Sequence, residues 1–214
     1  MWGRIIKVLY VDTYSDYLYS GIVINDVLVS ECQEKLGKDL SKEALPRIIG
    51  VFKKANITPK DLDKIIVVTG PGSFTGIRIG VTIAKTIAWS LNIPIVPISG
   101  LTAMAISNKQ EGYSMPLIDA RRGYVYGALY DNNINSIVED SHILLDELVK
   151  KCYDYRPITV ITNNEIVTDY NVNGYEPDIL KIVTYFKNKE GLNPHMINPI
   201  YLKKTEAEEK ANLW

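Results

Sequence analysis

A glycine-rich segment, VTGPGSFTGIRIGVTIAK at Val68 to Lys85, constrains the fold of this chain more than any other stretch. The strand pattern KIIVVTG leads into it, and a long apolar helix pattern follows from Gly76 to Leu91. Four glycines mark the change from strand to helix: Gly70, Gly72, Gly76 and Gly80. The segment therefore predicts a strand, a sharp turn and a helix in succession, which is a building unit of α/β proteins.

The patterns on either side of this segment predict a five-stranded mixed sheet. Three strand patterns open the chain, RIIKVLYVD, YLYSGIVI and VLVSECQ, and the last two meet across Asn25-Asp26, a pair suited to a tight hairpin turn. A helix follows, with Ser41 as its expected N-cap and Pro46 expected to delay or kink its start. Its apolar stripe is Leu45, Ile48, Ile49 and Phe52. With IPIVPIS as the fifth strand, three antiparallel strands precede βα alternation.

The second half of the chain repeats this plan after a polar stretch at residues 107–114. Its strand patterns are MPLIDA, YVYGALYD, INSIVE and ITVIT. Helical stripes lie between Leu145 and Cys152 and between Ile179 and Phe186, the latter bounded by Pro177 and Gly191. We therefore expect two α/β lobes of similar architecture, although no repeat is visible in the sequence itself.

Composition and charge narrow the classes of function. At 214 residues and 46% hydrophobic, the chain is long enough for a sizeable core. A net charge of −1 gives no electrostatic footprint for nucleic acid, so we expect contact with RNA only through a partner. The two cysteines lie far apart in the sequence, so they indicate neither a zinc site nor a disulfide framework. No apolar run approaches the length of a membrane-spanning helix. We expect a soluble, cytoplasmic protein with no membrane contact.

The glycine-rich turn raises the question of phosphate binding. A helix N-terminus favours an anion, and Asp12 and Thr13, at the end of the first strand, could orient a metal-bound phosphate, with Ser73 and Thr75 of the turn as further phosphate-binding candidates. The turn lacks the lysine of GxxxxGK[ST], however, and GxGxxG fails at Thr75. The competing interpretation is structural: Ser73 or Thr75 caps the helix, and Asp12 and Thr13 serve a turn.

The helix after the turn carries a ridge of small residues, Gly76, Gly80, Ala84 and Ala88, opposite Arg78 and its neighbours. Interior glycines cost a helix roughly 1 kcal/mol each relative to alanine, so close approach of another backbone should compensate. The ridge could pack on the protein's own sheet. Alternatively, this helix and the Leu45 to Phe52 helix could form a subunit interface.

Catalytic groups are scarce. His142 and His195 are the two histidines, and their separation excludes HxxxH and HExxH metal sites. Ser73 lacks the flanking glycines of a nucleophile elbow, since Pro71 and Thr75 occupy those positions. Asp119, Arg121 and Arg122 beside Gly123 form a polar turn, in which an arginine could bind an anion but is rather expected to pair with Asp119. No hydrolytic chemistry is indicated.

Four segments resemble the bacterial TsaB family, also called YeaZ. TGPGSFTGIRIG at Thr69 to Gly80 is similar to its signature, and VLYVDT, IDARRGYVYGALY and PIYLKKTEAE agree in order and spacing. The resemblance implies an actin-like, RNase H-like fold of two lobes. These would be residues 1–106, completed by a tail at 200–214, and residues 107–199.

The resemblance also implies a task. TsaB-like proteins act with TsaC, TsaD and TsaE to make N6-threonylcarbamoyladenosine (t6A) at position 37 of tRNAs that read codons beginning with A. TsaC-like enzymes make threonylcarbamoyl-adenylate, and the TsaD-like subunit transfers the threonylcarbamoyl group. This chain, lacking HxxxH, would be a non-catalytic scaffold that binds the TsaD-like subunit. The alternative remains an actin-like ATPase or phosphotransferase acting alone.

The resemblance further implies which residues take part. The signature loop would be Pro71, Gly72, Ser73, Phe74 and Thr75, and no cofactor would bind tightly, although ATP or ADP could sit at the partner interface. A homodimer is expected when the partner is absent. Leu40, Tyr124 and Lys203 depart from the family pattern. The partner interface would comprise Leu45, Ile48, Ile49, Phe52, Gly76, Arg78, Gly80 and Ala84.

Overall fold

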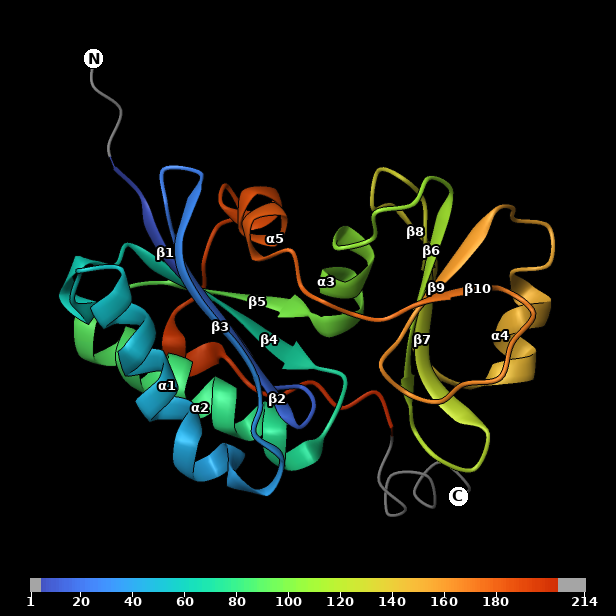
Figure 1. The fold of residues 1–214 in the computed structure, drawn as a ribbon, viewed down its shortest axis with the longest axis horizontal. Coiled ribbons are helices and arrows are strands. Elements are labelled where there is room, and N and C mark those ends of the chain that lie inside the picture. The colour runs from blue at the N-terminus through green and yellow to red at the C-terminus, as the bar shows by residue number, and fades with distance from the viewer. Residues whose placement is uncertain (1–4, 204–214) are drawn as a thin grey trace.

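The computed structural model describes residues 5–203, which form two five-stranded sheets (Figure 1). The first sheet has the order β3-β2-β1-β4-β5. Strands β1 to β3 are antiparallel, and β4 and β5 continue the sheet parallel to β1. Asn25 and Asp26 both have positive φ angles at the β2–β3 hairpin, as expected for a tight turn. The bounds are β1 (Lys7–Asp12), β2 (Tyr17–Ile24), β3 (Val27–Lys35), β4 (Lys64–Gly70) and β5 (Ile95–Ser99).

The second sheet repeats this arrangement in the order β8-β7-β6-β9-β10, which confirms the predicted fold class. It differs in one connection, because no helix separates β9 from β10. Strand β8, the third strand of this sheet along the chain, is also longer than the sequence predicted and ends at Leu144. The bounds are β6 (Tyr113–Asp119), β7 (Tyr124–Tyr130), β8 (Ser136–Leu144), β9 (Ile158–Ile161) and β10 (Asn171–Asn173).

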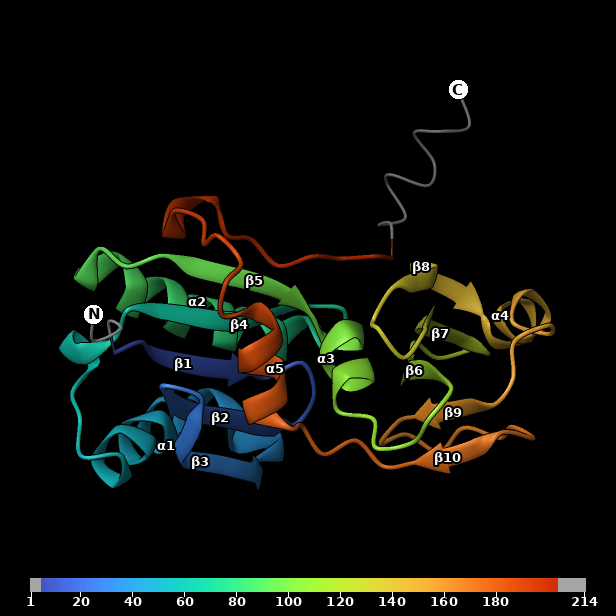
Figure 2. The same cartoon turned by 90° about the horizontal axis from the view of Figure 1, so that it is seen from above.

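Helices cover both faces of the first sheet (Figures 1 and 2). Helices α1 (Leu40–Lys54) and α2 (Phe74–Leu91) lie side by side on one face, and α3 (Gly100–Ile106) and α5 (Ile179–Phe186) lie on the other. Helix α4 (Leu145–Lys151) packs on β7 and β8 of the second sheet. Three short 3-10 turns complete the described elements: Gly37–Asp39, Pro59–Asp61 and Pro194–Met196.

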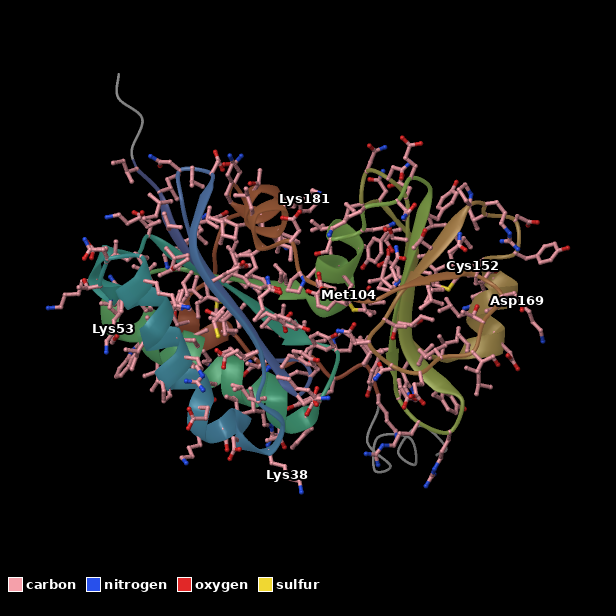
Figure 3. All side chains as sticks on the ribbon, in the orientation of Figure 1. Lys38, Lys53, Met104, Cys152, Asp169 and Lys181 are labelled. Atoms are coloured by element: carbon pink, nitrogen blue, oxygen red, sulfur yellow. The ribbon has the colours of Figure 1, made fainter. Side chains whose placement is uncertain are left out.

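Helix α3 joins the two lobes. It packs on β4 and β5 of the first sheet and on β6 and β7 of the second, and Met104 is fully buried between them (Figure 3). Polar contacts reinforce this junction: Ser99 Oγ and Tyr130 OH both donate to the Asp140 carboxylate, the latter at 2.6 Å. Thr102 Oγ1 lies 3.0 Å from Tyr130 OH. One core therefore runs from the first sheet into the second.

The chain returns to the first lobe earlier than predicted. Residues 107–199 were expected in the second lobe, but the apolar stripe of α5 packs on β1, β2 and β3. This stripe covers the sheet face that α1 and α2 leave open. Residues 191–203, which we call the strap, then run beside β5 (Figure 2), where Leu192 bridges to Ile95 and Ile200 N donates to Thr69 O at 2.8 Å. Residues 204–214 of the expected tail lie outside the described residues.

The start of α1 differs from the prediction in two respects. The helix begins at Leu40, directly after a 3-10 turn, and its N-cap is Asp39 without a side-chain hydrogen bond, so Ser41 is not the cap. Pro46 lies inside the helix, so the late start, one of the two effects expected of it, does not occur, and the other, a kink, stays a prediction. Because buried Leu40, Ala44 and Ile48 anchor the helix on both sides of Pro46, packing outweighs the local preference.

Candidate functional site

The glycine-rich turn packs directly on the loop after β1. Ser73 N donates to Tyr14 O at 2.6 Å, and Thr13 Oγ1 donates to Gly76 O at 2.7 Å. Gly72 has a φ of 152°, and a Cβ at this position would lie 2.4 Å from Tyr14 O. A Cβ at Gly76 would lie 2.2 Å from Thr13 O. The glycines are thus required because two backbone segments of the same chain touch here.

Ser73 caps helix α2, as the sequence predicted. Its hydroxyl accepts a hydrogen bond from Gly76 N at 3.2 Å, and Phe74 is the first helical residue. Thr75 follows in the first turn with an exposed side chain, and Pro71 is buried before the turn. Of the two residues considered for the cap, Ser73 therefore fills the role.

Asp12 and Thr13 do not face an open site with Ser73 and Thr75. Asp12 is fully buried at the end of β1, where it accepts hydrogen bonds from Tyr14 N at 3.0 Å and Tyr10 OH at 3.1 Å. Burial raises the pKa of Asp12 to about 7, against the opposing effect of these hydrogen bonds. Thr13 is 1% exposed and holds the Gly76 carbonyl. Both residues serve the internal contact between the two loops.

The small-residue ridge of α2 faces the protein's own sheet. Gly76, Gly80 and Ala84 are buried, and a Cβ at Gly80 would lie 2.3 Å from Thr13 Oγ1. The expectation that these three residues contact a partner is therefore wrong, because their neighbours are already internal. Ile48 and Phe52 of α1 are buried in the core as well.

The outer side of the same two helices is apolar and exposed. Leu45 and Ile49 are each 46% exposed on α1, and Phe74 is 55% exposed at the start of α2. Together with Ile79 and Ile83, these residues form what we call the helix-pair surface. A groove of about 490 Å³ runs between the helices. Its lining is Ser41, Leu45, Phe74, Thr75, Arg78, Ile79, Thr82 and Ile83.

The sequence prediction named Leu45 and Ile49 of this surface and Arg78 of the groove lining, and it missed Phe74, Ile79 and Ile83 as contact residues. A signal for the last two was present. Ile79 and Ile83 are four residues apart, and so are Leu45 and Ile49, so each helix carries a second apolar stripe besides the one that is buried.

The strap lies along another side of α2 and holds its larger side chains. Arg78 Nε donates to Tyr201 OH at 2.8 Å, and Lys85 Nζ donates to Ile197 O at 2.6 Å. Trp89 meets His195 edge to face, with ring centroids 6.1 Å apart. The strap meets the helix-pair surface at Phe74, whose ring stacks on that of Tyr201 with centroids 5.2 Å apart, while Leu45 and Ile49 of that surface stay exposed.

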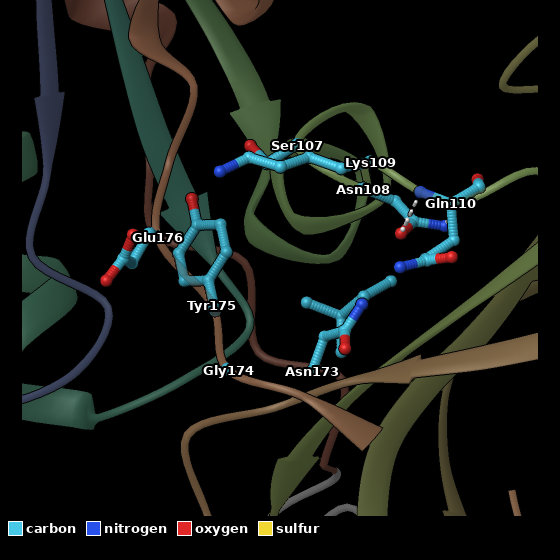
Figure 4. Close-up of a pocket in the computed structure, with 9 residues that line it drawn as sticks. Ser107, Asn108, Lys109, Gln110, Asn173, Gly174, Tyr175 and Glu176 are labelled. Atoms are coloured by element: carbon cyan, nitrogen blue, oxygen red, sulfur yellow. Dashed lines mark hydrogen bonds between the residues drawn. The ribbon is translucent and has the colours of Figure 1, made fainter. Parts of the chain in front are cut away.

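A second cavity, of about 340 Å³, lies near the junction of the lobes (Figure 4). It is lined by residues 107–110, Ile161 and residues 173–176. The Asn108 amide donates to Gln110 O and Ser114 Oγ, and Ser107 Oγ bonds with Ala103 O and Asp178 N. Because these groups already bond within the chain, they maintain the cavity's shape.

The structure brings no catalytic cluster together in its described part. His142 stacks on Tyr124 and His195 lies against Trp89, so the two histidines do not meet. Asp119 accepts a hydrogen bond from Arg121 N rather than pairing with its side chain. Within residues 5–203, no group of three or more His, Cys, Asp and Glu residues is arranged to hold a metal. No helix in this range is long and apolar enough to span a membrane.

The three positions that depart from the family pattern lie in different surroundings. Leu40 is buried at the start of α1, and Tyr124 is 38% exposed beside His142. Lys203 is exposed at the end of the described chain.

Two sheets of equivalent strand order, joined through a shared core, define a two-lobed protein of the actin-like class. The family model for TsaD, tRNA N6-adenosine threonylcarbamoyltransferase, matches residues 33–176. The tRNA threonylcarbamoyladenosine biosynthesis protein TsaB of Bacillus subtilis is 32% identical, over 95% of this chain and 96% of that protein. TsaB of Escherichia coli is 31% identical, over 67% of this chain and 64% of that protein. The chain belongs to the TsaB, or YeaZ, family of tRNA threonylcarbamoyladenosine biosynthesis proteins.

Solved structures agree on the fold. YeaZ from Pseudomonas aeruginosa superimposes with a TM-score of 0.75 at 18% sequence identity, covering 92% of this chain and 100% of that one. A second Pseudomonas aeruginosa structure, of a protein with similarity to peptidase YEAZ, gives a TM-score of 0.77 at 17% identity with the same coverage.

Proposed function

We propose that this chain is the non-catalytic scaffold subunit of the complex that installs t6A at position 37 of tRNAs that read codons beginning with A. In this role it binds and supports a TsaD-like catalytic subunit in the cytoplasm. The TsaB relatives and the match to the TsaD family model support a place in t6A biosynthesis. A TsaE-like ATPase joins the assembled complex, and tRNA contacts this chain only indirectly.

The observation that carries the proposal is the helix-pair surface. Leu45, Ile49 and Phe74 are exposed and Ile79 and Ile83 half-buried on two packed helices, and a groove runs between them. Large exposed apolar patches on soluble proteins mark sites of association, and a groove between helices suits an apolar helix from a partner. No cofactor is held tightly in this scheme, and ATP or ADP would bind only where the partner closes a site.

The test is size-exclusion chromatography with light scattering, on this protein alone and mixed with the TsaD-like protein of the same organism. A heterodimer is expected from the mixture, and a homodimer or monomer from the protein alone. Ile49→Asp should weaken the heterodimer by about tenfold or more, because it buries a charge in the apolar contact. Val167→Asp, at a position 96% exposed in the second lobe, is the matched control and should bind normally. Separate elution of the two wild-type proteins would contradict the proposal.

The ATPase or phosphotransferase alternative is less well supported. The loops that would cradle a phosphate are in van der Waals and hydrogen-bond contact with each other. Asp12 is fully buried beside Tyr10, and this burial raises the pKa of its carboxyl and so disfavours the charged form that magnesium prefers. Isothermal titration calorimetry with ATP and Mg²⁺ distinguishes the alternatives: binding and turnover by the isolated protein would favour the enzyme.

A further inference from the structure

One asparagine in this sequence is followed by glycine, in the pair Asn173–Gly174. Asn173 ends β10, the edge strand of the second sheet, and Gly174 begins residues 174–178, which return the chain to the first lobe (Figure 4). We call residues 174–178 the return connection. Asn173 is half-buried in the lining of the cavity of about 340 Å³, and Gly174 is exposed. Both residues are therefore accessible to water.

No hydrogen bond restrains the side chain of Asn173 or the backbone nitrogen that follows it. Within residues 5–203, neither the Asn173 amide nor the Gly174 N–H has a hydrogen-bond partner. Gly174 also lacks the Cβ that shields the backbone nitrogen of other residues. Asn171, in contrast, is followed by Val172, whose branched side chain crowds the same nitrogen. The chain thus offers one asparagine whose side-chain carbon is open to attack by the next backbone nitrogen.

We propose that Asn173–Gly174 is a site of deamidation, and that its isoaspartyl product loosens the connection between the lobes. The Gly174 nitrogen attacks Cγ of Asn173, the Cγ–Nδ2 bond breaks, and Nδ2 leaves as ammonia with the proton of the N–H. Water then opens the resulting five-membered succinimide, adding its hydroxyl to a carbonyl carbon and its proton to the ring nitrogen. Opening at Cγ gives aspartate. Opening at the other carbonyl gives isoaspartate, in which the main chain passes through Cγ.

Hydrogen bonds anchor the chain on both sides of Gly174. Asn173 O accepts a hydrogen bond from Thr162 N at 3.0 Å, and Tyr175 N donates to Asn163 Oδ1 at 2.7 Å. Asn163 Nδ2 also donates to Tyr175 O at 2.9 Å. Because a single residue separates these anchors, the additional main-chain carbon of isoaspartate breaks at least one of them.

Tyr175 transmits this change to the first lobe. It is 2% exposed, and its ring centroid lies 5.9 Å from that of Tyr14 and 5.7 Å from that of Tyr19. Both neighbours belong to the first lobe, whereas Asn163 follows β9 of the second. A displaced Tyr175 therefore loses packing between the lobes. Aspartate at position 173 leaves the main chain unchanged and keeps this packing.

The experiment incubates the full-length protein at mildly alkaline pH and samples it over time. Trypsin releases residues 152–181 as one fragment, which contains three further asparagines. Mass spectrometry of this fragment should show a gain of about 1 Da at Asn173 that increases with time, and a protein isoaspartate methyltransferase should methylate the aged sample. The internal controls, which should keep their mass, are Asn163, Asn164 and Asn171.

Gly174→Ala is the matched variant, because a Cβ at this position would meet only Asn163 Oδ1, at 3.5 Å, beyond its chain neighbours. It should slow the gain of mass at Asn173 by about tenfold, since the methyl group hinders the nitrogen. No gain at Asn173 in the wild type, or an equal gain at Asn171, would overturn the proposed site.

Freshly purified Asn173→Asp protein separates the two products, because it carries the new charge without the additional main-chain carbon. Its return connection should exchange backbone hydrogens at the rate of the fresh wild type. Aged wild-type protein enriched in isoaspartate should exchange about tenfold faster over residues 174–178. Aged protein that contains isoaspartate and yet exchanges like Asn173→Asp would overturn the effect on the connection between the lobes.

Discussion

Asp12 ends β1 as a buried carboxyl whose environment changes its acidity. Its side chain is fully buried and accepts hydrogen bonds from Tyr10 and Tyr14, yet desolvation dominates and raises its pKa from 3.8 to about 7. In the unfolded chain the same group ionises near pH 4. Between these values the folded protein retains a proton that the unfolded chain has released, so stability decreases as the pH rises through this window.

Asp12→Asn should remove this dependence. The amide keeps an acceptor for Tyr14 N and can donate to Tyr10, while it never ionises. The free energy of unfolding of the wild type, measured with urea between pH 5 and pH 8, should decrease by a few kcal/mol, up to roughly 4 kcal/mol over the full window. The variant should show little change over the same range.

Asp61→Asn is the control, because the pKa of Asp61 is lowered whereas that of Asp12 is raised. Hydrogen bonds from the Thr58 N–H and hydroxyl hold the pKa of Asp61 below its usual value, so this exposed group does not titrate between pH 5 and pH 8. The Asp61→Asn variant should therefore keep the wild-type slope. An Asp12→Asn variant with that same slope would show that Asp12 is not the group responsible.

At the scale of elements, α1 and α2 both contain interior glycines, but the surroundings of these glycines differ. Gly76 touches the backbone of the β1–β2 loop, whereas a Cβ at Gly50 of α1 would meet no atom within 4 Å. Gly76→Ala should lower the free energy of unfolding by about 1–3 kcal/mol, since Thr13 O cannot move without shifting β1. Gly50→Ala should raise it by about 0.5–1 kcal/mol through helix propensity.

Urea denaturation of both variants, followed by circular dichroism, measures these changes. The two substitutions are chemically identical and both fall in helices, so their difference isolates the effect of the close backbone contact. Equal stabilisation by both would mean that the ridge of α2 does not pack on the loop as described.

The spacing of apolar residues along α1 and α2 predicts a helix but not the surface against which each stripe packs. The two apolar stripes on α1 and α2 were visible as spacings of three and four residues, but a stripe does not specify the surface against which it is buried. Gly80 and Ala84 were assigned to a partner, and they pack on the sheet instead. Three-dimensional placement of Thr13 was needed to decide this, and no local pattern reports the distance between residues 13 and 80.

At the scale of the whole molecule, Asp140 joins the lobes. It accepts hydrogen bonds from Ser99 of the first lobe and Tyr130 of the second. Asp140→Ala removes the acceptor that the Ser99 and Tyr130 hydroxyls share at a partly buried junction, and only Tyr130 keeps a described hydroxyl partner, Thr102, so the change should cost about 1–3 kcal/mol of unfolding free energy. Hydrogen exchange should also accelerate in α3, whose first residues lie next to Ser99.

Glu139→Ala provides the comparison, because Glu139 is the exposed neighbour on the same strand. It should leave both the unfolding free energy and the exchange of α3 near their wild-type values. Indistinguishable behaviour of the Asp140→Ala and Glu139→Ala variants would argue that the apolar core around Met104 alone holds the lobes together.

The duplicated architecture itself could be predicted, since strand patterns, the Asn25-Asp26 turn and the glycine-rich turn each have local signatures. The lobe to which α5 belongs could not be predicted from the sequence. Its stripe of Ile179, Ile182 and Val183 would fit either sheet equally well as a pattern, and only the long-range return of the chain selects the first. The Asp140 junction was missed for the same reason, because its partners are about 10 and 41 residues away in sequence.

The return of α5 and the strap to the first lobe has a consequence for synthesis on the ribosome. Strands β1 to β5 emerge first, but the helix that covers one face of their sheet is translated only after the whole second sheet. At about 5–20 residues per second, several seconds separate the two events. During that interval the nascent sheet exposes the side chains that Ile179, Ile182 and Val183 later cover. We therefore expect the growing polypeptide to depend on chaperones that shield this apolar surface until α5 has emerged.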